Sequence, residues 1–177
     1  LWGSCVRRRR VSLRLLNSAP RNTAASQLRQ CCSSEEWVAR MLQQRPFRNS
    51  DALHAAADSA WIGLGEQDYL EAFSGHPKIG DIQSLQKKYS DSANLARSEQ
   101  SGVESASHDL LEKLSAANHA YEEKFGFIFI VCATGKSASE MLAILQGRLK
   151  RDRAAELKTA CEQQRQIFHL RLDKFVC

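Results

Sequence analysis

The chain has 177 residues, enough for one domain with a substantial hydrophobic core. Its formal charge of +5 suggests nucleic-acid binding, but the charge is unevenly distributed. Residues 1–34 hold seven arginines and no acidic residue, so 18 basic residues face 20 acidic ones over residues 35–177, a net −2. This body has no basic stripe interleaved with aromatic residues, so we expect no nucleic-acid partner there.

The N-terminal stretch LWGSCVRRRRVSLRLL is rich in arginine, contains serine and lacks acidic residues, which is typical of an organelle transit peptide. We expect residues 1–10 to be a basic leader, disordered or used for targeting, and residues 11–177 to form one helical domain. The final KFVC matches neither a peroxisomal tripeptide nor a prenylation box.

The cysteine spacing contains no C-x-x-C pair, which argues against a zinc site and a small secreted disulfide framework. The six cysteines are Cys5, Cys31, Cys32, Cys132, Cys161 and Cys177. We expect reduced thiols, no metal and no cofactor. The longest apolar run, FGFIFIVCA, is far shorter than the roughly 18 residues of a membrane span, so we expect no membrane partner.

Helical spacing of apolar residues dominates the first half of the chain. Ser33 and Glu36 predict a capping box for a helix that Pro46 ends. A second helix is predicted from Ser50 to Gly65. Its apolar face would consist of Leu53, Ala57, Trp61 and Leu64.

The second half also predicts helices. A short one over residues 66–73 precedes the loop FSGHPKIGD, and others are predicted over residues 82–89, 92–103, 107–125 and 153–175. Gly126 would end the long helix before it, and Ser137 with Glu140 predicts a capping box for a helix that follows.

The stretch GFIFIVCAT is apolar on both faces, too short for a buried helix and without a partner strand. Its backbone N–H groups would need partners other than a β-ladder: a ligand, water or helix carbonyls. The predicted fold class is all-α, a compact multi-helix bundle with one short extended apolar segment at about residues 127–133.

The loop FSGHPKIGD places His76 directly before Pro77, between Gly75 and Gly80. Proline fixes its own φ and pushes the preceding residue out of the α region, so His76 is predicted to lie on a short, stiff loop. Because imidazole titrates near neutrality, a histidine held in this way is a candidate acid or base.

Two charged residues, Glu99 and Arg171, fall on predicted apolar faces. Those faces are formed by Leu95 and Val103 on one helix, and by Ala160, Gln164 and Ile167 on the last helix. A buried charge needs a partner. Either Glu99 and Arg171 form a structural pair, or they meet His76 in a pocket, as an orienting carboxylate and a fork for a carbonyl or carboxylate.

Other candidates are weaker. CATGKS lacks the first glycine of a phosphate-binding loop, since Ile130 stands there, so Lys136 is predicted to be a solvated residue at a helix start. Cys132 lies in an apolar run that would raise its pKa. The remaining histidines, predicted to be structural or exposed, are His54, His108, His119 and His169.

Several separated motifs then occur in a distinctive order: LNSAP, RPF, HPKIGD, RSEQSGV, NHAYEEKFGFIFIVCATGKSASEML and ELKTACEQQRQIFHLRL. Together, over about residues 15–172, they resemble the OHCU decarboxylases (2-oxo-4-hydroxy-4-carboxy-5-ureidoimidazoline decarboxylases), in particular the decarboxylase domain of plant allantoin synthase. The resemblance implies an all-helical carboxy-lyase of urate (purine) catabolism that forms (S)-allantoin without metal or organic cofactor.

The resemblance also implies a set of site residues. The catalytic residues would be His76 as general acid/base, Glu99 and Arg171. The substrate-binding residues would be Pro77, Ala96, Arg97, Ser98, Gln100, Phe129, Ile130, Val131, Cys132 and Ala133.

The resemblance further implies a homodimer in the peroxisome or cytosol, with a hydroxyisourate hydrolase as a further domain or partner. Two alternatives stay open. The chain could be a non-enzymatic helical interaction domain that binds through its arginine-rich leader, or the same fold acting on a different ureide.

Overall fold

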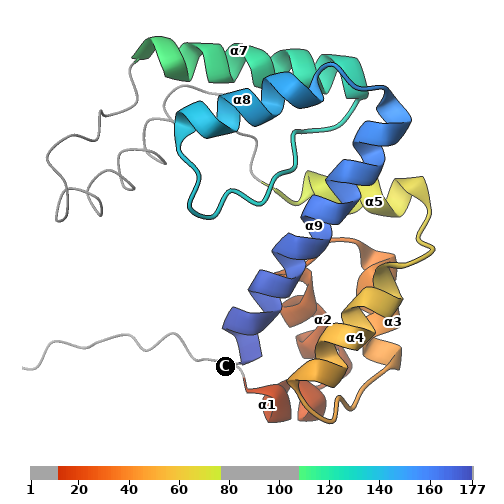
Figure 1. Ribbon diagram of the computed structural model, residues 1–177. Coiled ribbons are helices and arrows are strands. Elements are labelled where there is room, and N and C mark those ends of the chain that lie inside the picture. Colours follow the sequence, from red (N-terminus) through yellow and green to blue (C-terminus); the bar gives the residue numbers. More distant parts are fainter. Residues whose placement is uncertain (1–11, 77–107, 177) are drawn as a thin grey trace, which may run out of the picture. The chain divides into compact units, whose positions relative to one another are not determined.

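The computed structural model describes residues 12–76 and 108–176, with side chains as far as residue 173 (Figure 1). These residues form helices and no strand, which confirms the all-α class. The helices are α1 (Leu13–Ser18), α2 (Arg21–Arg29), α3 (Glu35–Gln43), α4 (Ser50–Trp61), α5 (Glu66–Ser74), α7 (His108–Phe125), α8 (Ala138–Arg148) and α9 (Arg153–Val176). The helices predicted over residues 82–89 and 92–103 lie outside the described residues, as does the leader.

The described residues form two compact units. The first unit runs to Gly75 and includes the chain from Gln163 onward, so it holds α1 to α5 and the C-terminal part of α9. The second unit, His76–Glu162, holds α7, α8, the segment between them and the N-terminal part of α9.

Aromatic side chains form the core of the first unit. The ring of Phe168 on α9 lies 5.3 Å from that of Trp37 on α3 and 5.5 Å from that of Trp61 on α4, measured between centroids. Trp37 also donates a hydrogen bond of 3.1 Å from Nε1 to the carbonyl oxygen of Ala57. These contacts fix the C-terminal part of α9 against α3 and α4.

The predicted capping box of α3 is wrong by one residue. Ser34 is the N-cap, and its Oγ accepts a hydrogen bond from the Trp37 N–H. Ser33 instead donates from Oγ to the carbonyl oxygens of Glu71 and Ala72, at 3.1 and 3.2 Å. The Ser33 side chain is therefore used to attach α5, a tertiary contact that local spacing does not reveal.

Three residues of the predicted apolar face, Leu53, Ala57 and Trp61, lie on α4 and are buried. The fourth, Leu64, is also buried but lies beyond the end of the helix. The ends of α4 differ from the prediction. Asn49 rather than Ser50 is the N-cap, accepting from the Ala52 N–H at 2.8 Å. The helix ends before Gly63, whose φ of 71° lies in the left-handed region, while Gly65 is the N-cap of α5.

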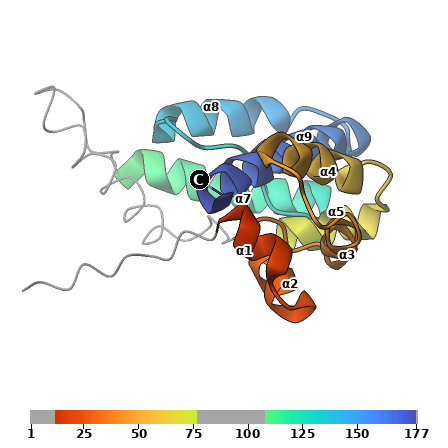
Figure 2. The same cartoon turned by 90° about the horizontal axis from the view of Figure 1, so that it is seen from below.

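In the second unit, α7 and α8 lie side by side in both views (Figures 1 and 2). Gly126, with φ of 77°, follows the end of α7 as predicted. The predicted capping box of α8 is also confirmed, since Ser137 and Glu140 exchange the two expected hydrogen bonds. Residues 127–133 between the two helices are neither helix nor strand, as expected.

The buried stripe of α9 is shifted from the predicted one. It consists of Ala160, Gln164, Phe168 and Leu172, which recur every four residues and are fully buried. Ile167 and Arg171 lie beside this stripe and are half-buried. The prediction chose the wrong neighbours because, at helical spacing, positions three and four apart share nearly the same face.

Candidate active site

His76 directly follows Gly75, the C-cap residue of α5, and its side chain is half-buried. A Cβ atom at Gly75 would lie 2.1 Å from Ser33 Oγ and 2.6 Å from Ser33 Cβ. Only glycine fits at this close approach. The attachment of Ser33 to α5 therefore fixes the chain one residue before the candidate acid/base.

Arg171 on α9 is held by a backbone carbonyl of the same unit. Its Nη1 donates a hydrogen bond of 3.0 Å to the carbonyl oxygen of Cys31, just after α2. Cys31 is itself held by its N–H, which donates to Leu28 O at 2.9 Å. This hydrogen bond fixes the Nη1 arm of the Arg171 guanidinium at the Cys31 carbonyl.

Two buried thiols lie near Arg171. Burial raises the pKa of both Cys31 and Cys32 to about 12, an effect that the arginine charge only partly opposes. These cysteines are therefore neutral near pH 7 and contribute no negative charge beside the guanidinium.

The irregular segment Phe129–Ala133 is held through its carbonyl groups. Ile130 O accepts a hydrogen bond of 2.7 Å from Arg148 Nη1, and Cys132 O accepts one of 2.9 Å from Lys136 Nζ. Lys136 is half-buried and folds back on the segment, so its prediction as a solvated residue is wrong. Cationic side chains thus hold two carbonyls of this segment, those of Ile130 and Cys132.

Behind this segment lies a buried polar network that was not predicted from the sequence. Arg148 Nε donates to Glu156 Oε1 at 2.6 Å, and the Tyr121 hydroxyl donates to the same carboxylate oxygen. A signal was present in the sequence. Arg148 follows Met141 and Leu145 at core spacing, and Glu156 precedes the buried stripe of α9 by one turn.

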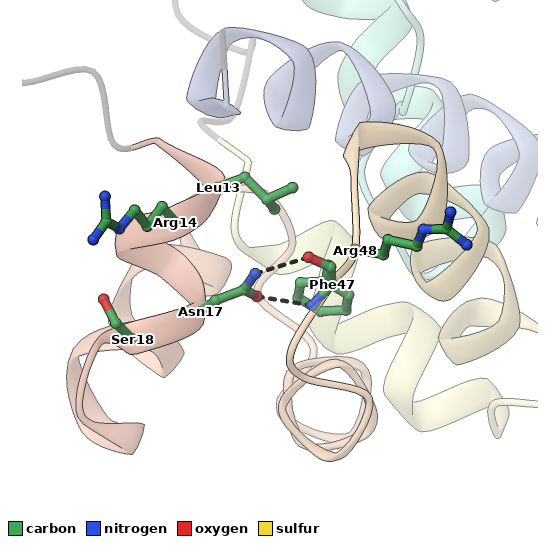
Figure 3. A pocket seen from close by; sticks show the side chains of 6 residues that line it. All are labelled: Leu13, Arg14, Asn17, Ser18, Phe47 and Arg48. Atoms are coloured by element: carbon green, nitrogen blue, oxygen red, sulfur yellow. Dashed lines mark hydrogen bonds between the residues drawn. The ribbon is translucent and has the colours of Figure 1, made fainter.

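A groove of about 410 Å³ opens on the first unit (Figure 3). It is lined by Leu13, Arg14, Asn17, Ser18, Phe47 and Arg48. Asn17 Nδ2 donates a hydrogen bond to the Phe47 carbonyl oxygen, and Asn17 Oδ1 accepts one from the Phe47 N–H, each at 2.8 Å. The Asn17 amide therefore holds α1 to the loop before α4. No predicted site residue lines this groove.

Two of the other histidines join α4 to α9. His54 Nδ1 lies 2.6 Å from His169 Nδ1, and the rings are stacked. His169 Nε2 lies 2.7 Å from Asp58 Oδ1, and Arg165 donates to both oxygens of Asp58 at 2.7 and 2.8 Å. This arrangement agrees with the structural role predicted for His54 and His169.

The pKa of Asp58 is set by opposing effects. Burial raises it, but the hydrogen bonds and charges of Arg165 and His169 outweigh burial, so the pKa lies below its ordinary value. Asp58 is therefore ionised at neutral pH, and α4 and α9 are joined by a charged contact.

Of the predicted catalytic residues, the structure describes His76 and Arg171, which belong to different units. Glu99 lies outside the described residues, as do Pro77 and residues 96–100. The convergence of the three catalytic residues stays a prediction. Within the described ranges, no helix is long and apolar enough to cross a membrane, and no group of three side chains is suited to hold a metal ion.

Comparison with solved structures places this fold among all-helical carboxy-lyases. It resembles a crystal structure of OHCU decarboxylase in the presence of (S)-allantoin, with a TM-score of 0.66 and 33% identity, over 82% of this chain and 94% of that one. The model of the OHCU decarboxylase family matches residues 17–173. The chain belongs to the OHCU decarboxylase family.

Two curated relatives illustrate the range of the family. The chain is 38% identical over 145 residues to the uric acid degradation bifunctional protein TTL of Arabidopsis thaliana. That match covers 81% of this chain but only 44% of the Arabidopsis protein. A 2-oxo-4-hydroxy-4-carboxy-5-ureidoimidazoline decarboxylase of Haloferax volcanii is 26% identical over 137 residues, covering 77% of this chain and 79% of that protein.

Proposed function

We propose that this protein decarboxylates 2-oxo-4-hydroxy-4-carboxy-5-ureidoimidazoline (OHCU) to (S)-allantoin in urate degradation. The observation that carries the proposal is the family match over residues 17–173, which spans almost the whole described helical fold. The likeness to the OHCU decarboxylase structure supports it, since that match covers 94% of the solved chain.

The substrate supplies its own electron sink. One ring carbon of OHCU carries a hydroxyl and a carboxylate, and its neighbour carries the ureido group and a C=N bond. When the bond to CO₂ breaks, its electron pair moves toward the C=N, whose nitrogen takes up a proton. The hydroxyl then becomes a carbonyl as the ureido-bearing carbon gains a proton, which yields allantoin and CO₂.

His76 is the proposed acid/base. An imidazole can accept the proton of the substrate hydroxyl and return a proton to carbon near neutral pH. Handing this proton to one face of the ring would give a single enantiomer. The close contact of Gly75 with Ser33 supports this role, because it fixes the backbone directly before His76.

Glu99 and Arg171 would orient the substrate and the imidazole. Glu99 is proposed to hold the imidazole or the substrate hydroxyl in place. Arg171 is proposed to bind a carbonyl or carboxylate of the substrate through its fork of N–H groups. The hydrogen bond from Arg171 to the Cys31 carbonyl supports this role, because it restricts the rotation of a long side chain.

The substrate-binding part of the proposal uses the backbone of Phe129–Ala133. Backbone N–H groups in this irregular segment would donate to the ring oxygens of the substrate. Its support is that the Ile130 and Cys132 carbonyls are already held by cationic side chains, so the segment has a fixed backbone without a β-ladder.

A direct assay tests the function. The purified protein is added to freshly generated OHCU, and the optical rotation of the allantoin is followed. Formation of (S)-allantoin at a rate proportional to protein concentration is expected. If OHCU decays at the protein-free rate and yields racemic allantoin, the chain is not an OHCU decarboxylase. Turnover of another ureide alone would indicate a shifted substrate.

We also propose a homodimer, acting in the peroxisome or cytosol next to a hydroxyisourate hydrolase domain or partner. The bifunctional Arabidopsis relative, of which this chain spans 44%, supports the pairing of two activities. Sedimentation velocity of the purified chain tests the dimer, and a single monomeric species at micromolar concentration would refute it.

A further inference from the structure

A buried arginine lies directly behind the irregular apolar segment. Arg148 donates from Nη1 to the Ile130 carbonyl at 2.7 Å and from Nε to Glu156 Oε1 at 2.6 Å. Its guanidinium carbon also lies 4.7 Å from the centroid of the Phe129 ring. Because the guanidinium is a rigid planar fork, holding it at Glu156 fixes where its other arm meets the segment.

The carboxylate that holds this arginine is itself fixed. Glu156 is fully buried, and its Oε1 accepts from both Arg148 and the Tyr121 hydroxyl. Burial raises the pKa of Tyr121, and the hydrogen bond to Glu156 raises it further, so the phenol stays protonated and donates. Burying the Arg148–Glu156 ion pair costs desolvation energy, and this cost can exceed the energy gained from the attraction of the two charges. A contribution to stability therefore does not by itself explain the pair, and we looked for a role in function.

The consequence for the segment follows from peptide geometry. In a planar trans peptide the N–H points opposite to the C=O. Since the Ile130 carbonyl points to Arg148, the N–H of Val131 points away from the buried network. Val131 is half-buried, and no described residue accepts a hydrogen bond from its N–H.

We propose that Arg148 and Glu156 are positioning residues for substrate binding: they fix the Ile130–Val131 peptide so that the Val131 N–H donates to a ring oxygen of the substrate. The inference rests on the proposed function, since it assigns a task within the segment proposed to bind the ureide. Neither side chain touches the substrate. Tyr121 supports this arrangement, because its hydroxyl donates a hydrogen bond to the Glu156 carboxylate.

The first test is a pair of conservative variants. Arg148→Lys keeps the charge but loses the fork, so it cannot hold Glu156 and Ile130 together. The matched control is Arg153→Lys. Arg153 also donates to a backbone carbonyl, that of Phe125 at 3.1 Å, and lies over the ring of Phe127. Arg148 instead donates to the Ile130 carbonyl and lies over the ring of Phe129.

Arg148→Lys should raise KM for OHCU by about tenfold, the effect of one misplaced hydrogen bond, with kcat little changed. Arg153→Lys should leave both parameters near those of the parent. A folded Arg148→Lys variant with the parental KM would overturn the proposal. If the parent itself shows no decarboxylase activity, the proposed function fails, and that outcome is distinct.

A double variant covers the case in which Arg148→Lys does not fold. Arg148→Met with Glu156→Gln removes both buried charges, which proteins often tolerate well, but leaves the Ile130 carbonyl without its donor. Unfolding should remain cooperative while KM rises. Parental KM in this variant would show that the pair is only structural.

Hydrogen exchange in the parent protein gives a readout that depends on no variant. The Val131 amide should exchange readily in the ligand-free protein and become protected when (S)-allantoin is added. An amide that is already strongly protected without ligand, or one whose exchange (S)-allantoin does not change, would contradict the inference.

Discussion

Arg171 and Cys31 are joined by a hydrogen bond of 3.0 Å, from the arginine Nη1 to the cysteine carbonyl oxygen. A carbonyl at the end of a helix is a rigid acceptor, so this bond selects one orientation of the guanidinium. Arg171 is half-buried beside the apolar stripe of α9, and its predicted place within that stripe is wrong. The guanidinium is therefore anchored at the edge of the core, as the substrate-binding role proposed for Arg171 would require.

Replacing Arg171 with lysine should weaken substrate binding while preserving the fold. Lysine keeps the charge but loses the fork that can hold Cys31 O and a substrate group together. We expect KM to rise about tenfold or more, because a charge-assisted hydrogen bond to substrate is lost. Steady-state kinetics and thermal unfolding measure the two effects. Parental KM in the variant would remove Arg171 from the substrate site.

Asp58→Asn should change how stability depends on pH. A carboxylate with a lowered folded-state pKa stabilises the fold above its unfolded value, near 4, and this contribution is lost as pH falls through the lowered value. The melting temperature of Asp58→Asn should thus lie below that of the parent at neutral pH, and the difference should shrink below about pH 4.

The control for this prediction is Asp51→Asn, at an exposed position in the first turn of α4. Its melting temperature should follow that of the parent closely. A difference between Asp58→Asn and the parent that stays constant from pH 7 to pH 2 would show that ionisation of Asp58 does not contribute.

The cysteines should differ in their reactivity toward alkylating reagents. Cys31 and Cys32 are buried, with pKa values raised to about 12, so almost no thiolate is present at pH 8. Cys132 and Cys161 are half-buried. Iodoacetamide followed by peptide mass spectrometry should detect modification of Cys132 and Cys161 long before that of the adjacent pair. Equal rates at all four positions would contradict this burial pattern.

Phe168→Ala should strongly destabilise the fold. Phe168 is fully buried, and its ring contacts those of Trp37 and Trp61. Removing such a ring typically costs about 3–5 kcal/mol in the free energy of unfolding. Leu170→Ala, at an exposed position on the same helix, is the matched control. Chemical denaturation should separate the two variants, and equal small losses would show that the aromatic cluster is not the core.

Local rules predicted some helix ends well and missed others for a physical reason. The capping box of Ser137 and Glu140 and the end of α7 at Gly126 depend only on neighbouring residues, and both are confirmed. At α3 two serines are adjacent, and tertiary contact decides between them. Ser33 attaches α5, which leaves Ser34 to cap.

In the candidate site, too, features set by neighbouring residues were predicted, and features set by tertiary contacts were not. The irregular character of residues 127–133 was predictable, because the run is short and apolar on both faces, and the sequence pattern offers no partner strand for it. The network that holds it was not predicted, since Arg148 and Glu156 meet across a turn between two helices. Lys136 was misjudged for a similar reason, as its long side chain folds back to the Cys132 carbonyl.

The central claim, that His76 is the acid/base of the decarboxylation, is tested most directly by His76→Asn. Asparagine stays polar but cannot exchange a proton near pH 7. Helical circular dichroism should match that of the parent, while the rate of (S)-allantoin formation should fall by about 10²–10⁴-fold. Allantoin that still forms should be racemic, because uncatalysed protonation has no preferred face. A folded variant that makes (S)-allantoin at the parental rate would contradict the account.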